Sequence, residues 1–219
     1  MKPYYGRDGI TIYHARCEDV LPSIDPATVG LLLTDPPYGI GLNANYSSRT
    51  GGKRADLRKT HANVHGDDKP FNPAALLAFR RSVLFGANYY ADKLPPTGSW
   101  LVWNRVSHSN GADAELAWTN LGGTVRMFTH AWDGFARSSE NSFHVHPTQK
   151  PVALMRWIVG RWTEPGDLVL DPFMGSGPIA QACHELGRRY VGIELVEEYC
   201  AVAVSRLSQQ TLDLTGGAV

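Results

Sequence analysis

The sequence predicts an α/β fold built on a mostly parallel sheet, and two observations carry this prediction. Residues 29–34, "VGLLLT", are apolar almost without interruption, which is typical of a strand buried on both faces of a parallel sheet. In the last third of the chain, short apolar runs alternate with segments of helical periodicity, as in consecutive strand–helix–strand units. The 219 residues contain no repeat and no linker, so we expect a single domain over residues 1–219.

The first part of the chain carries a local signal for each element. Strands are predicted at 9–15, 29–35, 82–86, 99–104 and 124–132, and helices at 17–24, 72–81 and 112–123. Asn72 can cap the second helix, and Pro73 suits a first helical position. Two glycines provide the stop of the third helix. The last strand of this part alternates apolar and polar residues.

The last third of the chain has the clearest pattern. It is predicted as a helix at 150–162, a strand at 167–171, a helix at 177–187, a strand at 188–194 and a helix at 196–207. One face of the first of these helices is apolar, and it carries Val152, Met155, Ile158, Val159 and Trp162. Strands and helices therefore alternate to the end of the chain.

Two long segments, 39–70 and 133–149, lack apolar periodicity. The first is polar, rich in glycine and basic, and a loop of this length inside a compact domain is usually functional or disordered. Its basic residues are Arg49, Lys53, Arg54, Arg58 and Lys59. A solvated surface loop is the simple interpretation, and binding to phosphates is the functional one.

Composition and charge narrow the functional classes. The net charge is zero, so any nucleic-acid binding must depend on a local basic patch. No apolar run is long enough to span a bilayer, and the polar start is unlike a signal peptide, so we expect a cytoplasmic protein without a membrane partner. The cysteines are scattered, and His130, His144 and His146 form no ligand pattern, so no metal site is expected.

The first chemical motif is "DPFMGSG", which begins at Asp171, the end of a predicted strand. The small-residue turn Gly175-Ser176-Gly177 opens a helix, and the next strand ends in Glu194. Glycines let a ligand approach the backbone, and a carboxylate after the second strand can accept the hydroxyls of a ribose. The phosphate-loop lysine is missing, so a ribose-bearing ligand without a pyrophosphate fits best. Any strand–turn–helix can also carry Gly-x-Gly for structural reasons.

The second motif is Asp35-Pro36-Pro37-Tyr38, directly after a buried strand. Two prolines remove backbone donors and leave carbonyl acceptors, Asp35 adds a carboxylate, and Tyr38 offers a flat face. Acceptors beside an aromatic ring suit a planar ligand with an exocyclic NH2 group. An aspartate that caps a proline-rich turn is the simpler alternative.

Together the two motifs resemble the S-adenosylmethionine-dependent amino-methyltransferases of DNA, whose motifs are D-P-P-Y and D-P-F-x-G-S-G. The methylation motif comes first and the cofactor motif last, which is similar to the permuted β group of that family. The segment "HPTQKPVALM", residues 146–155, resembles the H-P-T-x-K-P-x-x-L block of this group. The resemblance implies a Rossmann-like twisted sheet with helices on both faces in the permuted methyltransferase topology.

The resemblance also implies roles for individual residues in cofactor binding. The glycine turn and Phe173 would contact the methionine part of S-adenosylmethionine, Asp171 its amino group, and Glu194 its ribose. Asp35, at the end of the neighbouring strand, is included among the cofactor-contacting residues. The remaining members of this set are Thr148 and Lys150 near the cofactor carboxylate, and Cys17 and Asp19 at the adenine pocket. The family usually has Gly-Asp before that cysteine, and this chain has Ala15 and Arg16.

The implied reaction is methylation of the N6 amine of adenine in double-stranded DNA, with S-adenosylhomocysteine as product. Asp35 and the Pro36 carbonyl would accept the amine hydrogens, and Pro37 and Tyr38 would complete the catalytic motif. The base must leave the duplex to reach such a pocket. The loop 39–70 would contact DNA, and residues 104–145 would form a small target-recognition region. Trp103, Trp118 and Trp132 in or beside that region are expected in the core.

Several alternatives remain open from the sequence. Cytosine-N4 methylation uses the same amine chemistry, although a serine in place of Asp35 is more usual there. Methylation of RNA or of a protein amide, usually with N-P-P-Y, and a non-catalytic nucleic-acid-binding module of the same fold are further options. The recognition sequence, the oligomeric state, with a homodimer among the options, and the biological role are not given by the sequence.

Overall fold

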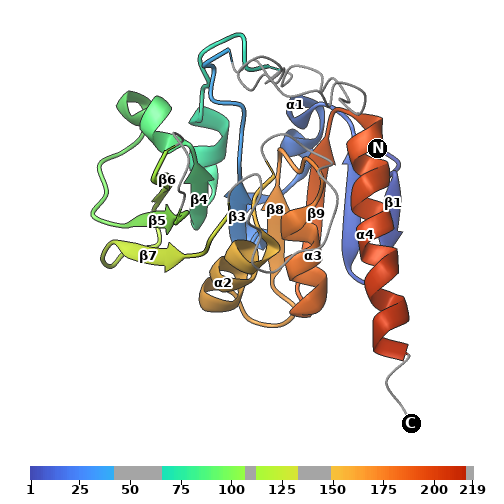
Figure 1. Ribbon diagram of the computed structural model, residues 1–219. Helices are drawn as coiled ribbons and strands as arrows, with labels where there is room; N and C mark the ends of the chain where they lie inside the picture. The colour runs from blue at the N-terminus through green and yellow to red at the C-terminus, as the bar shows by residue number, and fades with distance from the viewer. Residues whose placement is uncertain (42–65, 107–111, 133–148, 216–219) are drawn as a thin grey trace, which may run out of the picture.

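The computed structural model describes residues 1–41, 66–106, 112–132 and 149–215, with side chains described up to residue 208. Within these ranges one sheet of nine strands has the order β1-β2-β9-β8-β3-β4-β6-β5-β7 (Figure 1). The strands are β1 (Tyr5–Arg7), β2 (Ile10–His14), β3 (Leu31–Thr34), β4 (Ser82–Phe85), β5 (Trp100–Asn104), β6 (Ala114–Thr119), β7 (Arg126–Thr129), β8 (Leu168–Asp171) and β9 (Arg189–Glu194).

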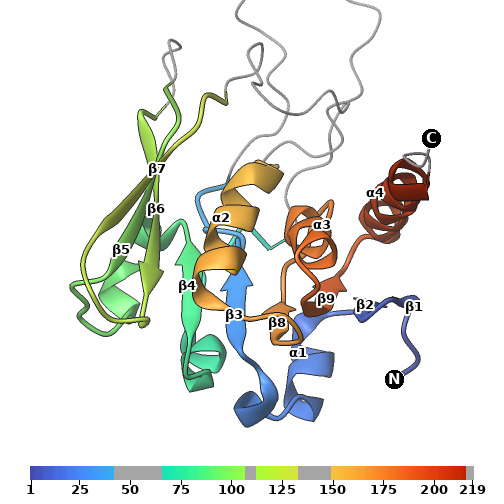
Figure 2. The same ribbon diagram turned by 90° about the horizontal axis from the view of Figure 1, so that it is seen from below.

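The described α-helices are α1 (Cys17–Val20), α2 (Val152–Trp162), α3 (Pro178–Glu185) and α4 (Glu197–Thr215). Short 3-10 turns lie at Leu21–Ser23, Pro26–Thr28, Ala74–Ala78, Ala87–Tyr89 and Ala91–Lys93. Figure 2 shows α2, α3 and α4 side by side on one face of the sheet, whereas α1 and short turns lie on the other face. The expected α/β architecture with helices on both faces is confirmed.

The centre of the sheet is parallel. Neighbouring strands from β2 through β9, β8 and β3 to β4 pair in parallel, whereas β1 and β6 run antiparallel to their neighbours. His14 lies opposite Glu194, and Leu32 lies opposite Leu170. These registers place the first predicted strand beside the strand ending at Glu194, and they make the strand before Asp35 a neighbour of the strand ending at Asp171.

The alternation of side chains along β3 divides the core into two layers. Leu31 and Leu33 pack in the cluster that includes residues of α2, α3 and α4, and Leu32 packs in the cluster on the opposite face. All three are completely buried. The uninterrupted apolar run of the sequence therefore reflects a strand covered on both sides. Trp103, Trp118 and Trp132 are buried as expected.

Two local predictions differ from the structure, and one strand has no counterpart among the predictions. The segment 112–123, predicted as a helix, contains the strand β6, because Ala117 pairs with both Phe85 and Leu101 and this tertiary pairing outweighs the helix propensity of alanine and leucine. The segment 72–81 forms only a 3-10 turn, although Asn72 Oδ1 does accept a hydrogen bond from Ala74 N at 3.1 Å. The strand β1 was not predicted.

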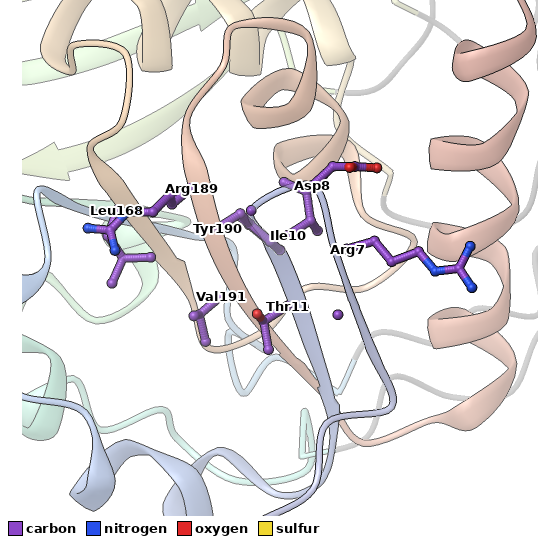
Figure 3. Close-up of a pocket in the computed structure, with 10 residues that line it drawn as sticks. Arg7, Asp8, Ile10, Thr11, Leu168, Arg189, Tyr190 and Val191 are labelled. Atoms are coloured by element: carbon purple, nitrogen blue, oxygen red, sulfur yellow. The ribbon is translucent and has the colours of Figure 1, made fainter.

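A hollow of about 500 Å³ opens where β2, β8 and β9 begin. Figure 3 shows its lining, with Ile10 and Thr11 from β2 beside Tyr190 and Val191 from β9. The three acids of the predicted site follow or end their strands, so they lie at the opposite edge of the sheet. The hollow is therefore separate from the predicted chemistry.

Candidate active site

The acids Asp35, Asp171 and Glu194 lie at one edge of the sheet. Asp35 follows β3, Asp171 ends β8 and Glu194 ends β9, and these three strands are consecutive neighbours that run in parallel. A direct contact links the two motifs, since Thr34 Oγ1 donates a hydrogen bond of 2.7 Å to Asp171 Oδ1. The topology therefore brings together the residues that the sequence pattern selected from distant parts of the chain.

The Asp35 carboxylate receives a donor on each oxygen. Lys150 Nζ lies 2.5 Å from Oδ2, and the Tyr38 hydroxyl donates to Oδ1. The side chain of Asp35 keeps 20% of its surface exposed, whereas that of Lys150 keeps 6%. Burial raises the pKa of Asp35, and the Lys150 ammonium offsets part of this rise. Asp35 is thus a partly accessible carboxylate held by a buried cation.

Glu115 is a second carboxylate beside Lys150, and no motif in the sequence identified it. Its Oε2 lies 3.1 Å from Lys150 Nζ, and its Oε1 lies 3.3 Å from Arg105 Nη1. Burial alone would lower the pKa of Lys150, but Asp35 and Glu115 hold it well above its ordinary value. Because β6 runs antiparallel to β4, the start of β6 reaches the edge where the parallel strands end. The sequence pattern predicted a helix over residues 112–123 and therefore did not place Glu115 at this edge.

The Tyr38 ring is fixed by a glycine and a second tyrosine. Gly86 has φ of +65°, and a Cβ atom at this position would collide with the Tyr38 ring. Tyr89 stacks on Tyr38 with ring centroids 5.2 Å apart and planes 18° apart, and it is 54% exposed. Burial and the Asp35 carboxylate raise the pKa of Tyr38 well above its ordinary value, so its hydroxyl remains a donor. The sequence pattern did not point to Gly86 or Tyr89.

Asp67 fixes the chain after the Asp-Pro-Pro-Tyr motif at residues 35–38. Its Oδ1 accepts a hydrogen bond of 2.7 Å from Gly39 N, and its backbone carbonyl accepts one of 2.9 Å from Gly41 N. The start and the end of the predicted DNA-contacting segment 39–70 therefore meet beside the motif. The basic residues Arg49, Lys53, Arg54, Arg58 and Lys59 lie outside the described residues.

The glycine turn closes on the carboxylate of Glu194. Glu194 Oε2 accepts a hydrogen bond from Gly175 N, and Oε1 accepts one from Val196 N, both of 2.8 Å. Gly177 has φ of +78°, and a Cβ atom there would lie 2.7 Å from Ala203 Cβ. A carboxylate has about four lone-pair positions, so these two backbone donors alone do not fill those of Glu194. The turn is tight, and Gly177 lets it pack closely against Ala203.

Asp171 is almost fully buried and is saturated with protein donors. Besides Thr34, Phe173 N donates to Oδ1 at 3.2 Å, and the Tyr190 hydroxyl donates to Oδ2 at 3.0 Å. Burial raises the pKa of Asp171 to about 7, although these hydrogen bonds lower it. These hydrogen bonds give Asp171 a structural function at the base of the turn, and its contact with a cofactor stays a prediction.

Gln149 presents a buried donor next to the glycine turn. Its Oε1 accepts hydrogen bonds from Arg206 Nη2 at 2.8 Å and from Ser176 Oγ at 3.4 Å. Its Nε2 has no acceptor within the described part of the chain. A buried donor without an acceptor is unfavourable, so an acceptor on a bound ligand would be stabilising there. The neighbouring Thr148, predicted to contact a cofactor, lies outside the described residues.

The segment predicted to line an adenine pocket adjoins Glu194. Ala15 N donates a hydrogen bond of 3.0 Å to the Glu194 carbonyl, and Cys17 begins α1 directly afterwards. Cys17 is half-buried, and burial raises the pKa of its thiol to about 12, so it is an unreactive thiol. Asp19 is exposed. Both residues lie near the expected edge of the sheet, and their contact with a cofactor stays a prediction.

The described ranges offer neither a metal centre nor a membrane span. No cluster of three or more His, Cys, Asp or Glu side chains there has an arrangement suited to a metal ion. None of the helices in the same ranges is long and apolar enough to cross a membrane.

A comparison with protein families decides the class of the chain. The model of a DNA methylase family, which covers adenine-N6 and cytosine-N4 enzymes, matches residues 86–205, more than half of the sequence. The chain belongs to this DNA methylase family. It is thus a DNA methyltransferase.

Individual relatives of this methylase span nearly its full length. The type II methyltransferase M2.DpnII of Streptococcus pneumoniae is 26% identical over 263 aligned residues, covering 95% of this chain and 93% of the relative. The crystal structure of the M1.HpyAVI complex with S-adenosylmethionine has a TM-score of 0.56 and 24% identity, covering 90% of this chain and 98% of the other. The cytosine-N4-specific PvuII methyltransferase has a TM-score of 0.64 and 15% identity, covering 94% and 88%. At these identities the solved structures establish a shared fold.

The buried carboxyl of Asp171 makes the stability of this methylase depend on pH. An acid whose pKa is raised in the folded state stabilises the fold below its unfolded pKa, and this contribution is lost as pH rises through the folded value. A rise of the Asp171 pKa from 3.8 to about 7 corresponds to about 4 kcal/mol of folding free energy.

We therefore expect the free energy of unfolding of the wild type to fall, relative to that of Asp171→Asn, by up to about 4 kcal/mol between pH 4 and pH 7. Urea unfolding of both proteins across this range measures the difference, with the exposed Asp92→Asn as a control that should follow the wild type. A constant difference between wild type and Asp171→Asn would contradict the assignment.

Proposed function

We propose that this DNA methyltransferase transfers a methyl group from S-adenosylmethionine to the N6 amine of adenine in double-stranded DNA. One observation carries the proposal: Asp35, a carboxylate beside two prolines and a tyrosine, adjoins the glycine turn through the paired strands β3 and β8 and the hydrogen bond from Thr34 to Asp171. An amine-accepting group and a nucleoside-accepting group thus share one edge of the sheet.

The residues around the turn fit S-adenosylmethionine. Glu194 offers acceptors for ribose hydroxyls, and the buried Gln149 Nε2 offers a donor for the cofactor carboxylate. The turn Gly175-Ser176-Gly177 and Phe173 are proposed to contact the methionine part, with Cys17 and Asp19 toward the adenine. A solved neighbour of similar fold is a complex with the same cofactor. When bound, this cofactor supplies a methyl group that is activated by a positively charged sulfur.

The residues after β3 would activate the target amine. The lone pair of an adenine amine is delocalised into the ring, so the nitrogen is a poor nucleophile. Asp35 and the Pro36 carbonyl would accept hydrogen bonds from its two hydrogens and so return electron density to the nitrogen. Pro37 would fix the turn, and Tyr38 would lie beside the base. Positioning and fixed charges do most of this work. The nitrogen gains the methyl group and releases one proton.

One feature of the sequence supports adenine over cytosine as the target. Asp35 occupies the position where cytosine-N4 enzymes more usually have a serine. The fold does not discriminate, since the PvuII enzyme, which is cytosine-N4-specific, has a similar structure. Either base must be flipped out of the duplex to reach Asp35, at a cost of a few kcal/mol.

Identification of the methylated base tests this proposal. Plasmid DNA treated with the enzyme and labelled S-adenosylmethionine should contain N6-methyladenine after digestion, as detected by mass spectrometry. N4-methylcytosine alone would establish the rival activity. Absence of any methylated base at saturating cofactor would support the non-catalytic alternative.

Variants of the two acids should separate the amine site from the cofactor site. Asp35→Ala should reduce transfer by about 10³-fold or more while S-adenosylmethionine still binds, because it removes the acceptor of the amine. Glu194→Ala should weaken cofactor binding by about 10-fold or more, because it removes the acceptor for ribose. Calorimetry measures binding, and equal losses of cofactor affinity in both variants would contradict these roles.

The basic segment after the methylation motif is proposed to bind DNA phosphates. Removal of one cation that pairs with a phosphate should reduce the slope of log affinity against log salt by about one unit. Replacement of Arg54, Arg58 and Lys59 by alanine should therefore weaken DNA binding and flatten its salt dependence, with cofactor affinity unchanged. Titrations at several salt concentrations measure the slope, and an unaltered slope would indicate a solvated surface segment.

A further inference from the structure

The ammonium group of Lys150 lies between two carboxylates from different parts of the fold. Asp35 Oδ2 is 2.5 Å away and Glu115 Oε2 is 3.1 Å away, and Arg105 contacts the other oxygen of Glu115. Two cations and two anions are thus arranged in a row from β5 and β6 to the end of β3. Only 6% of the Lys150 side chain is exposed, so this ammonium depends on its protein partners.

In this row both carboxylate oxygens of Asp35 already accept a hydrogen bond from the protein. Lys150 and Tyr38 each donate to one of its two oxygens, so about half of its lone-pair positions are taken and a target amine would share Oδ2 with the ammonium. A close ammonium also stabilises the ionised carboxylate and lowers its basicity, which weakens it as an acceptor for a neutral amine. Asp35 is therefore a stronger acceptor for the amine hydrogens when the ammonium moves away from Oδ2.

Glu115 offers the place to which the ammonium can move. A buried ammonium that leaves its only anion is strongly destabilised, but Lys150 Nζ is already within ion-pair distance of Glu115. A small shift toward Glu115 keeps one ion pair intact while it releases Asp35. Arg105 holds Glu115 from the opposite side, at 3.3 Å, and so keeps that carboxylate in position.

We propose that Lys150 is a latch on the amine-binding carboxylate, and that Glu115 is the positioning residue that draws the latch off Asp35 when the target amine enters. The inference rests on the proposed methyl transfer. It assigns Glu115 an action through Lys150 and no contact with the substrate.

The charged groups around Asp35 make the latch visible in the pH dependence of transfer. Among the described residues, five ionisable side chains surround Asp35. They are Lys150 before α2, Glu115 on β6, Tyr38 in the same turn, Tyr90 after β4 and Asp171 on β8. Lys150 lowers the pKa of Asp35, and Glu115 raises it. Loss of Glu115 should therefore move the acidic limb of the rate to lower pH, and loss of Lys150 should move it to higher pH.

Single-turnover methyl transfer at saturating S-adenosylmethionine and DNA tests the latch with Glu115→Gln, Lys150→Met and the double variant. Glutamine has the size of glutamate and keeps an acceptor for Arg105. Glu115→Gln should transfer about tenfold or more slowly, with cofactor affinity within about twofold of wild type, because the ammonium then stays on Asp35. The double variant should be faster than Glu115→Gln, because no ammonium remains to block the carboxylate.

The exposed Glu164→Gln, near the start of β8, is the matched control and should transfer at the wild-type rate. Glu115→Asp keeps a carboxylate and should recover part of the loss, which provides a second reading if Glu115→Gln folds poorly. A double variant no faster than Glu115→Gln, or an acidic limb that does not move, would overturn the latch. Failure of the wild type itself to transfer methyl groups would instead refute the proposed function.

Discussion

The arrangement of the site depends on the parallel pairing of β3 with β8. Leu31 and Leu32 lie opposite Val169 and Leu170, and the hydrogen bond from Thr34 to Asp171 ties the ends of the two strands. These last two residues are 137 positions apart in the sequence. Without this pairing, Asp35 and the glycine turn would not share an edge, and the two motifs would have no common function.

Around this pairing, ionisable groups are arranged in two separate environments. Asp171 sits beneath the surface and is satisfied by hydroxyl and backbone donors, so it holds the turn in shape. Asp35 sits one strand away, remains partly exposed and is balanced by a buried cation. Two aspartates at equivalent strand ends therefore differ in role, because their donors and their access to solvent differ.

Much of the site could be predicted from sequence because its residues lie in short contiguous motifs at strand ends. The apolar run of β3 placed Asp35, and the strand–turn–helix pattern placed Gly175 and Glu194. Glu115 could not be found, because alanine and leucine favour a helix locally and only pairing with β4 and β5 makes the segment a strand.

Interactions made across the fold were similarly invisible in the sequence. Tyr89 becomes part of the site only by stacking on Tyr38, and Gln149 only by its approach to Ser176 and Arg206. Asp67 carries no local signal for its hydrogen bond with Gly39. The packing of the whole sheet determines which distant residues meet. A single sequence does not show these pairings directly.

The order of the strands in the sheet differs from their order in the sequence, and this has a consequence for synthesis of the protein on the ribosome. The central strand β3 is made early, but its neighbour β8 and the covering helix α2 are made more than a hundred residues later. At about 5–20 residues per second, the delay between Thr34 and Asp171 is about 7 to 27 s. During that interval the apolar face of Leu31 and Leu33 lacks its native cover. The sheet can close only when the last third has been made, and until then the nascent chain exposes apolar surface of the kind that chaperones bind.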